Sequence, residues 1–297
     1  MLNAYKEFGV LSRTFMLEEH SKILEEIRSR GEPFRNCSEN ELVLAEGRIY
    51  VELVERICQL IEDFSTLCYA LWNDLSHFPV NVLRKETSAV PNRLKELTGP
   101  VWWFTLLRYP DLDTLQLSIE DKEFPRQHYE RNIHVLQNLA KVLERFRKLH
   151  WRFYTKHKHA NPLIYGIKKV EVEGEPAIVI PAIDDEKHPE RVRGIVMNYS
   201  MYKEQRKIAN TVINLMKGLL DRAVLFIELD GKPIIEHVSY YKMNDEVAQR
   251  VQRLIGEYNK NIRRNPLEVT LKIDIPHEVL RQFVEFYDNL VLGSFDT

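Results

Sequence analysis

The sequence predicts a predominantly helical α+β protein, in which an antiparallel bundle of long helices is followed by a smaller part with an antiparallel sheet. Two long segments repeat apolar residues at alternating steps of four and three, the spacing of amphipathic helices that pack at a shallow angle. After Pro162 the apolar period shortens toward two, which is typical of strands. We therefore predict a helical bundle over residues 1–161 and an α+β domain over residues 162–297, either separate or packed as one unit.

The first long helix is predicted over Leu42–Phe78. Its apolar stripe consists of Tyr50, Val54, Ile57, Ile61, Phe64, Cys68, Leu71, Leu75 and Phe78. Ser38 and Glu41 have the spacing of a capping box, in which each side chain bonds to the other residue's backbone amide. Pro79 is expected to end the helix, because proline disfavours helical geometry in the residue before it.

Two shorter helices flank the first long one. The earlier is predicted over Met16–Arg30 and ends at Gly31, and the later over Val82–Leu97 and ends at Gly99. Glycine ends helices well because it adopts a left-handed conformation at little cost. Repeated helices with short connections favour an antiparallel bundle in this half of the chain.

A second long helix is predicted to start after Pro125 and to end before Pro162. Its stripe consists of Val135, Leu139, Val142, Phe146, Leu149 and Phe153. Between the two halves of the bundle, the alternation of Leu115, Leu117 and Ile119 favours a short strand.

The second half of the chain alternates between strand and helix patterns. Strands over Ile167–Val172, Ala177–Ile183 and Gly194–Tyr199, with a turn at Glu173-Gly174, predict a meander. The remaining elements are a helix over Met201–Arg222, a hairpin of Val224–Leu229 with Ile234–Tyr240, a helix over Asp245–Tyr258, a strand over Leu267–Ile275 and a helix after Pro276. A continuation of the helix past Arg222 is the alternative to the first hairpin strand.

Composition predicts a cytoplasmic protein without a membrane segment. No apolar run approaches the ~18 residues of a transmembrane helix, and the N-terminus lacks a signal-peptide pattern. Cys58 and Cys68 lie ten residues apart on one predicted helix, about 15 Å at 1.5 Å per residue, which is too far for a disulfide. The net charge of −2 means that binding to an anionic partner requires a local patch.

Such a patch is predicted around the stretch RFRKLHWRFYTKHKHAN, Arg145–Asn161. On a helix, Lys141, Arg145, Arg152 and Lys156 fall on one flank of the apolar stripe. Rows of cations of this kind bind phosphate backbones, and we predict phosphate contacts from Lys141, Lys148 and Lys156. The alternative is that these long side chains cover the flank and keep their charges in water.

The same helix geometry places His150 and His157 close to the apolar face. A histidine there is either a hydrogen-bonded core residue or a group that transfers protons near neutral pH. Seven residues separate the two by about 10 Å along the axis, so one metal ion does not join them. We predict no metal and no cofactor.

The pattern Arg145-Phe-Arg-Lys-Leu-His150, repeated as Arg152-Phe-Tyr-Thr-Lys-His157 near the end of a long helix, resembles the HEPN family of helical bundles. The resemblance covers the first 160 residues or so and implies a metal-independent ribonuclease that acts at a homodimer interface. It implies Arg152 with His157, or Arg145 with His150, as catalytic pairs: arginine stabilises phosphoryl charge, and histidine serves the attacking or leaving oxygen.

Two alternatives remain open at this stage. In the first, the protein is a non-catalytic dimeric scaffold or interaction module, whose cationic flank meets an acidic protein partner and whose buried histidines are structural; RNA is the partner that the HEPN resemblance implies. In the second, Asp111, Glu120 and Lys122 form a metal-dependent nuclease site, in which carboxylates hold magnesium and lysine positions water. Trp102-Trp103-Phe104 is interpreted as core or dimer contact, with base stacking as the alternative.

Overall fold

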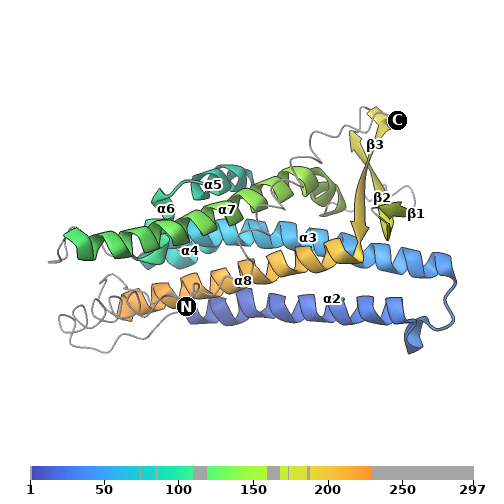
Figure 1. The fold of residues 1–297 in the computed structure, drawn as a ribbon, viewed down its shortest axis with the longest axis horizontal. Coiled ribbons are helices and arrows are strands. Elements are labelled where there is room, and N and C mark those ends of the chain that lie inside the picture. Colours follow the sequence, from blue (N-terminus) through green and yellow to red (C-terminus); the bar gives the residue numbers. More distant parts are fainter. Residues whose placement is uncertain are drawn as a thin grey trace. The chain divides into compact units, whose positions relative to one another are not determined.

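The part of the chain that the structure describes is mostly helical and contains one three-stranded antiparallel sheet, as the sequence predicts (Figure 1). The computed structural model describes residues 2–73, 75–83, 86–109, 119–158, 168–172, 174–185 and 188–228. Over this part of the chain, no helix is both long enough and apolar enough to cross a membrane. The strands and helices expected beyond residue 228 lie outside the described residues.

The elements follow one another along the chain with short connections. The helices are α1 (Leu2–Ala4), the π-helical η1 (Tyr5–Leu11), α2 (Ser12–Ser29), η2 (Glu32–Phe34), α3 (Glu39–Trp72), η3 (Leu75–His77), α4 (Phe78–Leu83), η4 (Thr87–Ala89), α5 (Val90–Leu97), α6 (Val101–Leu107), α7 (Ile119–Lys158) and α8 (Tyr199–Glu228). The strands are β1 (Lys168–Val172), β2 (Glu175–Asp185) and β3 (His188–Asn198).

The chain divides into two compact units, each assembled from distant segments. Unit 1 comprises Met1–Val10, Glu62–Glu144 and Thr211–Thr297, and unit 2 comprises Leu11–Ile61 and Arg145–Asn210. The long helices α3, α7 and α8 each contribute residues to both units, and the last residue of η1, Leu11, begins unit 2. The boundary predicted between residues 161 and 162 falls outside the described residues and stays a prediction.

Helix α3 confirms the longest predicted stripe, although it ends earlier than expected. The stripe from Tyr50 to Leu71 is buried along its whole length. At the start, the Ser38 backbone amide donates to Glu41 Oε2 at 2.7 Å and the Glu41 amide donates to Ser38 Oγ at 3.4 Å, which confirms the capping box. The helix stops at Trp72, and Pro79 lies inside α4 at its second residue, where the missing amide costs nothing.

Other helix boundaries differ from the prediction for local reasons. Residue Arg30, not Gly31, has the left-handed conformation that ends α2, with φ of 53°. The helix predicted from Val82 does not begin there, because Val82 belongs to the end of α4; the short η4 follows at Thr87, and the next α-helix, α5, begins at Val90. The predicted end of that helix at Leu97 is confirmed.

Helix α7 is longer than predicted, and α8 replaces a predicted strand. Helix α7 begins at Ile119, so the expected start after Pro125 is wrong and Ile119 is helical instead of the end of a short strand. Leu115 and Leu117 lie outside the described residues. Helix α8 continues to Glu228, so the alternative of a continued helix is confirmed over the first hairpin strand.

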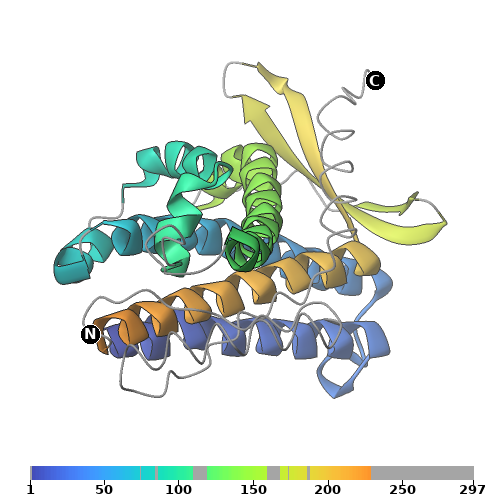
Figure 2. The ribbon, with the colours of Figure 1, turned by 60° about the vertical axis from the view of Figure 1, so that its left-hand side comes forward.

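In unit 2, helices α2, α3 and α8 pack against one another through polar contacts as well as apolar ones. The Arg28 guanidinium of α2 donates to Glu46 of α3 at 2.6 Å and lies 4.3 Å from the ring centre of Tyr199 of α8. Tyr50 of α3 contacts Tyr202 of α8 at 5.7 Å between ring centres. In Figure 1 and Figure 2, the parts of α2, α3 and α8 that belong to unit 2 run alongside one another.

The sheet of unit 2 is the predicted meander, in the order β1-β2-β3. Val172 pairs with Glu175 across the turn, and Gly174 takes a φ of 79°, which glycine adopts without strain. Figure 2 shows β3 running directly into α8. On β1, Lys169 bonds to Glu39 at 2.9 Å and so ties the sheet to the start of α3.

In unit 1, side chains from one helix satisfy carbonyls at the end of another. Arg108 donates to the Leu71 carbonyl at 2.7 Å, and the Trp103 indole donates to the Leu97 carbonyl at 2.7 Å. Arg222, which is fully buried, donates to the Leu107 carbonyl at 2.7 Å. These carbonyls lack partners within their own helices and carry the negative end of the helix dipole, so cationic donors stabilise them.

Candidate functional site

The candidate site is the last part of α7, which belongs to unit 2 and begins at Arg145. The buried side of α7 is continuous along the helix and repeats at steps of three and four. Its members are Tyr129, Ile133, Leu136, Leu139, Leu143, Phe146, His150 and Tyr154. Because this stripe fixes which side of the helix faces the protein, the opposite side faces solvent.

The solvent-facing side of this part of α7 carries cations in a regular row. Arg145 is half-buried and Lys148, three residues later, is exposed. Arg152 and Lys156 follow at steps of four in the sequence of the same helix, and their side chains lie outside the described residues. The helix axis rises by about 16 Å from Arg145 to Lys156 at 1.5 Å per residue.

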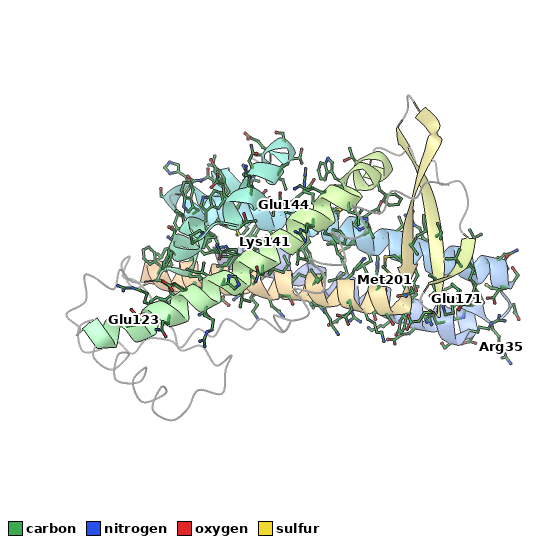
Figure 3. The ribbon with its side chains drawn as sticks, turned by 45° about the horizontal axis from the view of Figure 1, so that its top comes forward. Arg35, Glu123, Lys141, Glu144, Glu171 and Met201 are labelled. Atoms are coloured by element: carbon green, nitrogen blue, oxygen red, sulfur yellow. The ribbon has the colours of Figure 1, made fainter. Side chains whose placement is uncertain are left out.

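Lys141 occupies the turn of α7 before Arg145 and belongs to unit 1. It is half-buried, and its ammonium group donates to Asn138 Oδ1 at 3.5 Å. Asn138 in turn contacts His134 at 3.3 Å. Figure 3 marks Lys141 and Glu144 on this part of α7, where Glu144 is the acidic residue next to the row.

His150 lies on the buried side of the helix, not on the cationic side. Its side chain is 5% exposed, and its ring centre lies 4.4 Å from that of Phe146. Burial lowers the pKa of His150 to about 3, because an apolar environment disfavours the charged imidazolium. The imidazole is therefore neutral near pH 7 and closed to solvent.

The structure does not bring Arg145 and His150 together. The helix is continuous through both, and five residues at 100° per residue separate their directions by about 140°. Arg152 and His157 have the same spacing, and the helix remains continuous to Lys158. The side chains of that second pair lie outside the described residues, so their pairing stays a prediction.

The cationic row is accompanied by an aromatic side chain that sequence reasoning missed. Trp151 is half-buried, and the Arg147 guanidinium lies 3.8 Å from its ring centre. Tyr154 approaches the same indole at 5.5 Å with a tilt of 53° between rings. The spacing of Arg147 and Trp151, four residues apart on a predicted helix, is the signal that would have found this pair.

The alternative sites receive little geometric support. Glu120 and Lys122 lie in α7 and not on the neighbouring strands that the metal-dependent nuclease motif requires, and Asp111 lies outside the described residues. In the part of the chain that the structure describes, no group of three or more His, Cys, Asp or Glu residues is placed to hold a metal ion. Trp102 and Trp103 are buried, as the core interpretation predicts, whereas Phe104 is exposed and does not belong to the core.

Comparisons with models of protein families, with characterised proteins and with solved structures find no match to this chain. The function is therefore argued from the site itself.

Proposed function

We propose that the protein is a non-catalytic RNA-binding module of the cytoplasm, which contacts phosphate groups through the solvent-facing side of α7. The observation that carries this proposal is the placement of Arg145 and Lys148 on that side, opposite the buried stripe. Lys and Arg residues that neutralise phosphates release the counterions of the nucleic acid, which makes binding favourable and dependent on salt.

RNA fits this surface better than an acidic protein does, because an aromatic ring lies next to its cationic groups. The half-buried Trp151 lies three residues after the exposed Lys148, on the neighbouring part of the helix surface. Aromatic rings between phosphate-binding cations are typical of proteins that bind polynucleotides. An acidic protein surface would form ion pairs with the cations but would not require a stacking contact with the indole.

The absence of catalysis is proposed from the state of His150. A general acid or base requires contact with the reacting group and a pKa near the working pH. His150 is buried, and burial lowers its pKa to about 3. Its role is therefore packing next to Phe146, and the resemblance to ribonucleases depends on Arg152 and His157 alone.

The proposal also places the protein in the cytoplasm and expects it to form a homodimer. Cys58 and Cys68 are buried free thiols and Cys37 is a half-buried free thiol, which supports a reducing compartment. The HEPN resemblance implies the homodimer. Light scattering of the purified protein tests it, and we expect a mass twice that of one chain. A mass equal to one chain would contradict the homodimer and would leave the RNA-binding surface unaffected.

The phosphate contacts are tested by the salt dependence of RNA affinity. We expect the double variant R145Q/K148Q to bind a fluorescein-labelled single-stranded RNA more weakly than the wild type. The slope of log K against log salt should become shallower by about 1.4, which is about 0.7 for each lost phosphate contact. Fluorescence anisotropy between about 50 and 200 mM salt measures the slope.

The matched control is K217Q, which removes an exposed lysine of α8 outside the proposed site. The control should keep the affinity and the salt slope of the wild type. An unchanged slope in R145Q/K148Q, or an equal loss in K217Q, would show that the charge of the whole molecule and not this surface binds RNA.

Catalysis is tested separately by incubating mixed RNA with the protein in EDTA. We expect intact RNA with the wild type. Cleavage that disappears in both R152A and H157A would overturn the non-catalytic proposal and establish the second pair as catalytic. Cleavage that requires a divalent metal ion would instead favour the site of Asp111, Glu120 and Lys122.

A further inference from the structure

Trp151 is the only tryptophan of unit 2, and its side chain is neither sealed in the core nor fully exposed. The Arg147 guanidinium lies 3.8 Å from its ring centre, at the distance of a stacked cation–π contact. Arg147 itself is only 9% exposed. A buried partner therefore holds the indole on its protein side, while part of the ring reaches solvent.

This arrangement limits the conformations that the indole can adopt. Tyr154, which is 2% exposed, contacts the ring at 5.5 Å between centres, and the Arg147 guanidinium covers part of one face. Contacts with two buried side chains hold the ring in place before any ligand arrives. A ring that is already ordered binds a flat ligand with a smaller loss of conformational entropy.

The charges next to the indole indicate what such a ligand carries. Lys148 is exposed and lies three residues before Trp151, so the two occupy neighbouring positions on the helix surface. Arg145 lies three residues before Lys148 and extends the positive surface by one turn. A flat aromatic group joined to successive negative charges matches this surface, and a nucleobase with its flanking phosphates has that form.

We infer that Trp151 stacks on an unpaired base of a single-stranded polynucleotide, while Lys148 contacts the adjoining phosphate. The inference rests on the proposed function, because it specifies the class of RNA that the same surface binds. Bases of a duplex are already stacked on both faces, and the deep groove of A-form RNA is too narrow for side chains to reach them. Single strands therefore gain a contact at Trp151 that duplexes do not.

The test compares W151L with the wild type on single-stranded and double-stranded RNA of the same sequence. We expect W151L to bind the single strand about five- to 150-fold more weakly, the range measured for the loss of one stacked base. Affinity for the duplex and the salt slope should remain those of the wild type, because neither depends on stacking. W151F, which keeps a stacking ring, should recover most of the single-strand affinity.

The matched control is W72L, which removes a partly exposed tryptophan of unit 1 that stacks on Trp102. W72L should bind single strands as the wild type does. Circular dichroism verifies that each variant is folded, and duplex affinity gives W151L a second test of an intact surface. Equal affinity for single-stranded DNA and RNA would support the inference, because stacking does not involve the 2′-hydroxyl.

Three results would overturn the inference in distinguishable ways. Unchanged single-strand affinity in W151L would exclude stacking while the salt-dependent RNA binding of the proposed function remained. Equal losses for single strands and duplexes would mean that Trp151 only supports the fold of α7. If the wild type bound acidic polypeptide and no nucleic acid at all, both the inference and the proposed function would be wrong.

Discussion

His20 and His150 are both held inside unit 2, and burial lowers the pKa of each imidazole below its ordinary value. For His20, burial is the largest cause and Arg56 adds to it, whereas Glu52, whose Oε2 lies 3.1 Å from His20 Nε2, opposes it. His150 has no such opposing carboxylate among the causes of its shift, and its pKa falls to about 3. Each ring is therefore a neutral packing group near pH 7.

The first residue-scale prediction concerns stability in acid. The pKa of His150 is lower in the folded state, about 3, than in the unfolded chain, 6.5, so the unfolded state binds more protons between these values. The stabilising contribution is complete above pH 6.5 and is lost as the pH falls toward 3. Between pH 6 and 4, the unfolding free energy of the wild type should fall more steeply than that of H150L, by up to about 1.4 kcal/mol per pH unit.

Urea denaturation at several pH values measures this difference in slope. H134Q, which changes an exposed histidine of α7, is the control and should follow the wild type. Parallel curves for the wild type and H150L would contradict the burial of His150 as a neutral group.

The second residue-scale prediction compares two glycines. Gly174 has a φ of 79°, and a Cβ placed on it would meet nothing within 4 Å, so G174A adds backbone strain and no clash. We expect G174A to destabilise the protein by about 1 kcal/mol. G31A is the control, because its Cβ would lie 3.4 Å or more from its neighbours and its φ of −53° suits alanine. Chemical denaturation should show a loss for G174A and little or none for G31A.

At the scale of the element, the start of α3 depends on an interaction that is complete within four residues. Ser38 and Glu41 exchange bonds through their side chains and backbone amides, and this places the first turn of a 34-residue helix. Helix ends elsewhere depend on distant donors, such as Arg108 at the end of α3. The start of α3 is therefore stabilised by residues next to it in the sequence, whereas its end is stabilised by a residue far along the chain.

We expect S38A to lower the free energy of unfolding by about 1 kcal/mol, the usual cost of losing a capping side chain. N40A is the control, because Asn40 is exposed in the same turn but does not cap the helix. Urea denaturation should shift the midpoint for S38A without changing the m-value. A loss in N40A as large as that in S38A would mean that the turn is sensitive to any substitution and not to the cap.

At the scale of the whole molecule, the two units are connected by helices and not by flexible linkers. Each of α3, α7 and α8 crosses from one unit to the other without a break. A helix is cooperative along its length, because each residue added to it gains a hydrogen bond once the first turn has formed. When one unit loses its structure, the helices that it shares with the other unit are therefore shortened.

We predict that unfolding is a single transition for both units. L53A, in unit 2, and L215A, in unit 1, each remove a fully buried side chain and should cost about 2–5 kcal/mol. Each variant should shift one common transition, with coincident curves from circular dichroism and tryptophan fluorescence. Two separate transitions, of which each variant shifts only one, would show that the units unfold independently.

Much of the fold was predictable because it depends on local periodicity. The stripes of α3 and α8, the meander and the capping box all come from residues close together in the chain, and the structure confirms them. The predicted start of α7 is too late, because proline favours a helix start and Pro125 lies six residues after the first residue of the helix. The sequence leaves the extension of α8 open, because apolar β-branched residues suit both a strand and a buried helix.

Less of the candidate site was predictable. The cationic residues and the nearness of His150 to the apolar stripe followed from helix geometry, but the contact of Arg147 with Trp151 was missed. Arg147 and Lys148 are neighbouring cations in the sequence, and only the structure distinguishes the buried Arg147 from the exposed Lys148. Both are long basic side chains, and charge alone does not indicate which of them lies against a ring.

The sequence by itself determined where most helices and strands form, since the repeat of apolar residues and the capping side chains act between near neighbours. Only the tertiary structure decided which polar groups are buried, such as His150, Arg147 and Arg222. It also placed the left-handed residue of α2 at Arg30 instead of the glycine that follows. The physical reason is that burial depends on segments that lie far apart along the chain, and no local pattern records which of them meet.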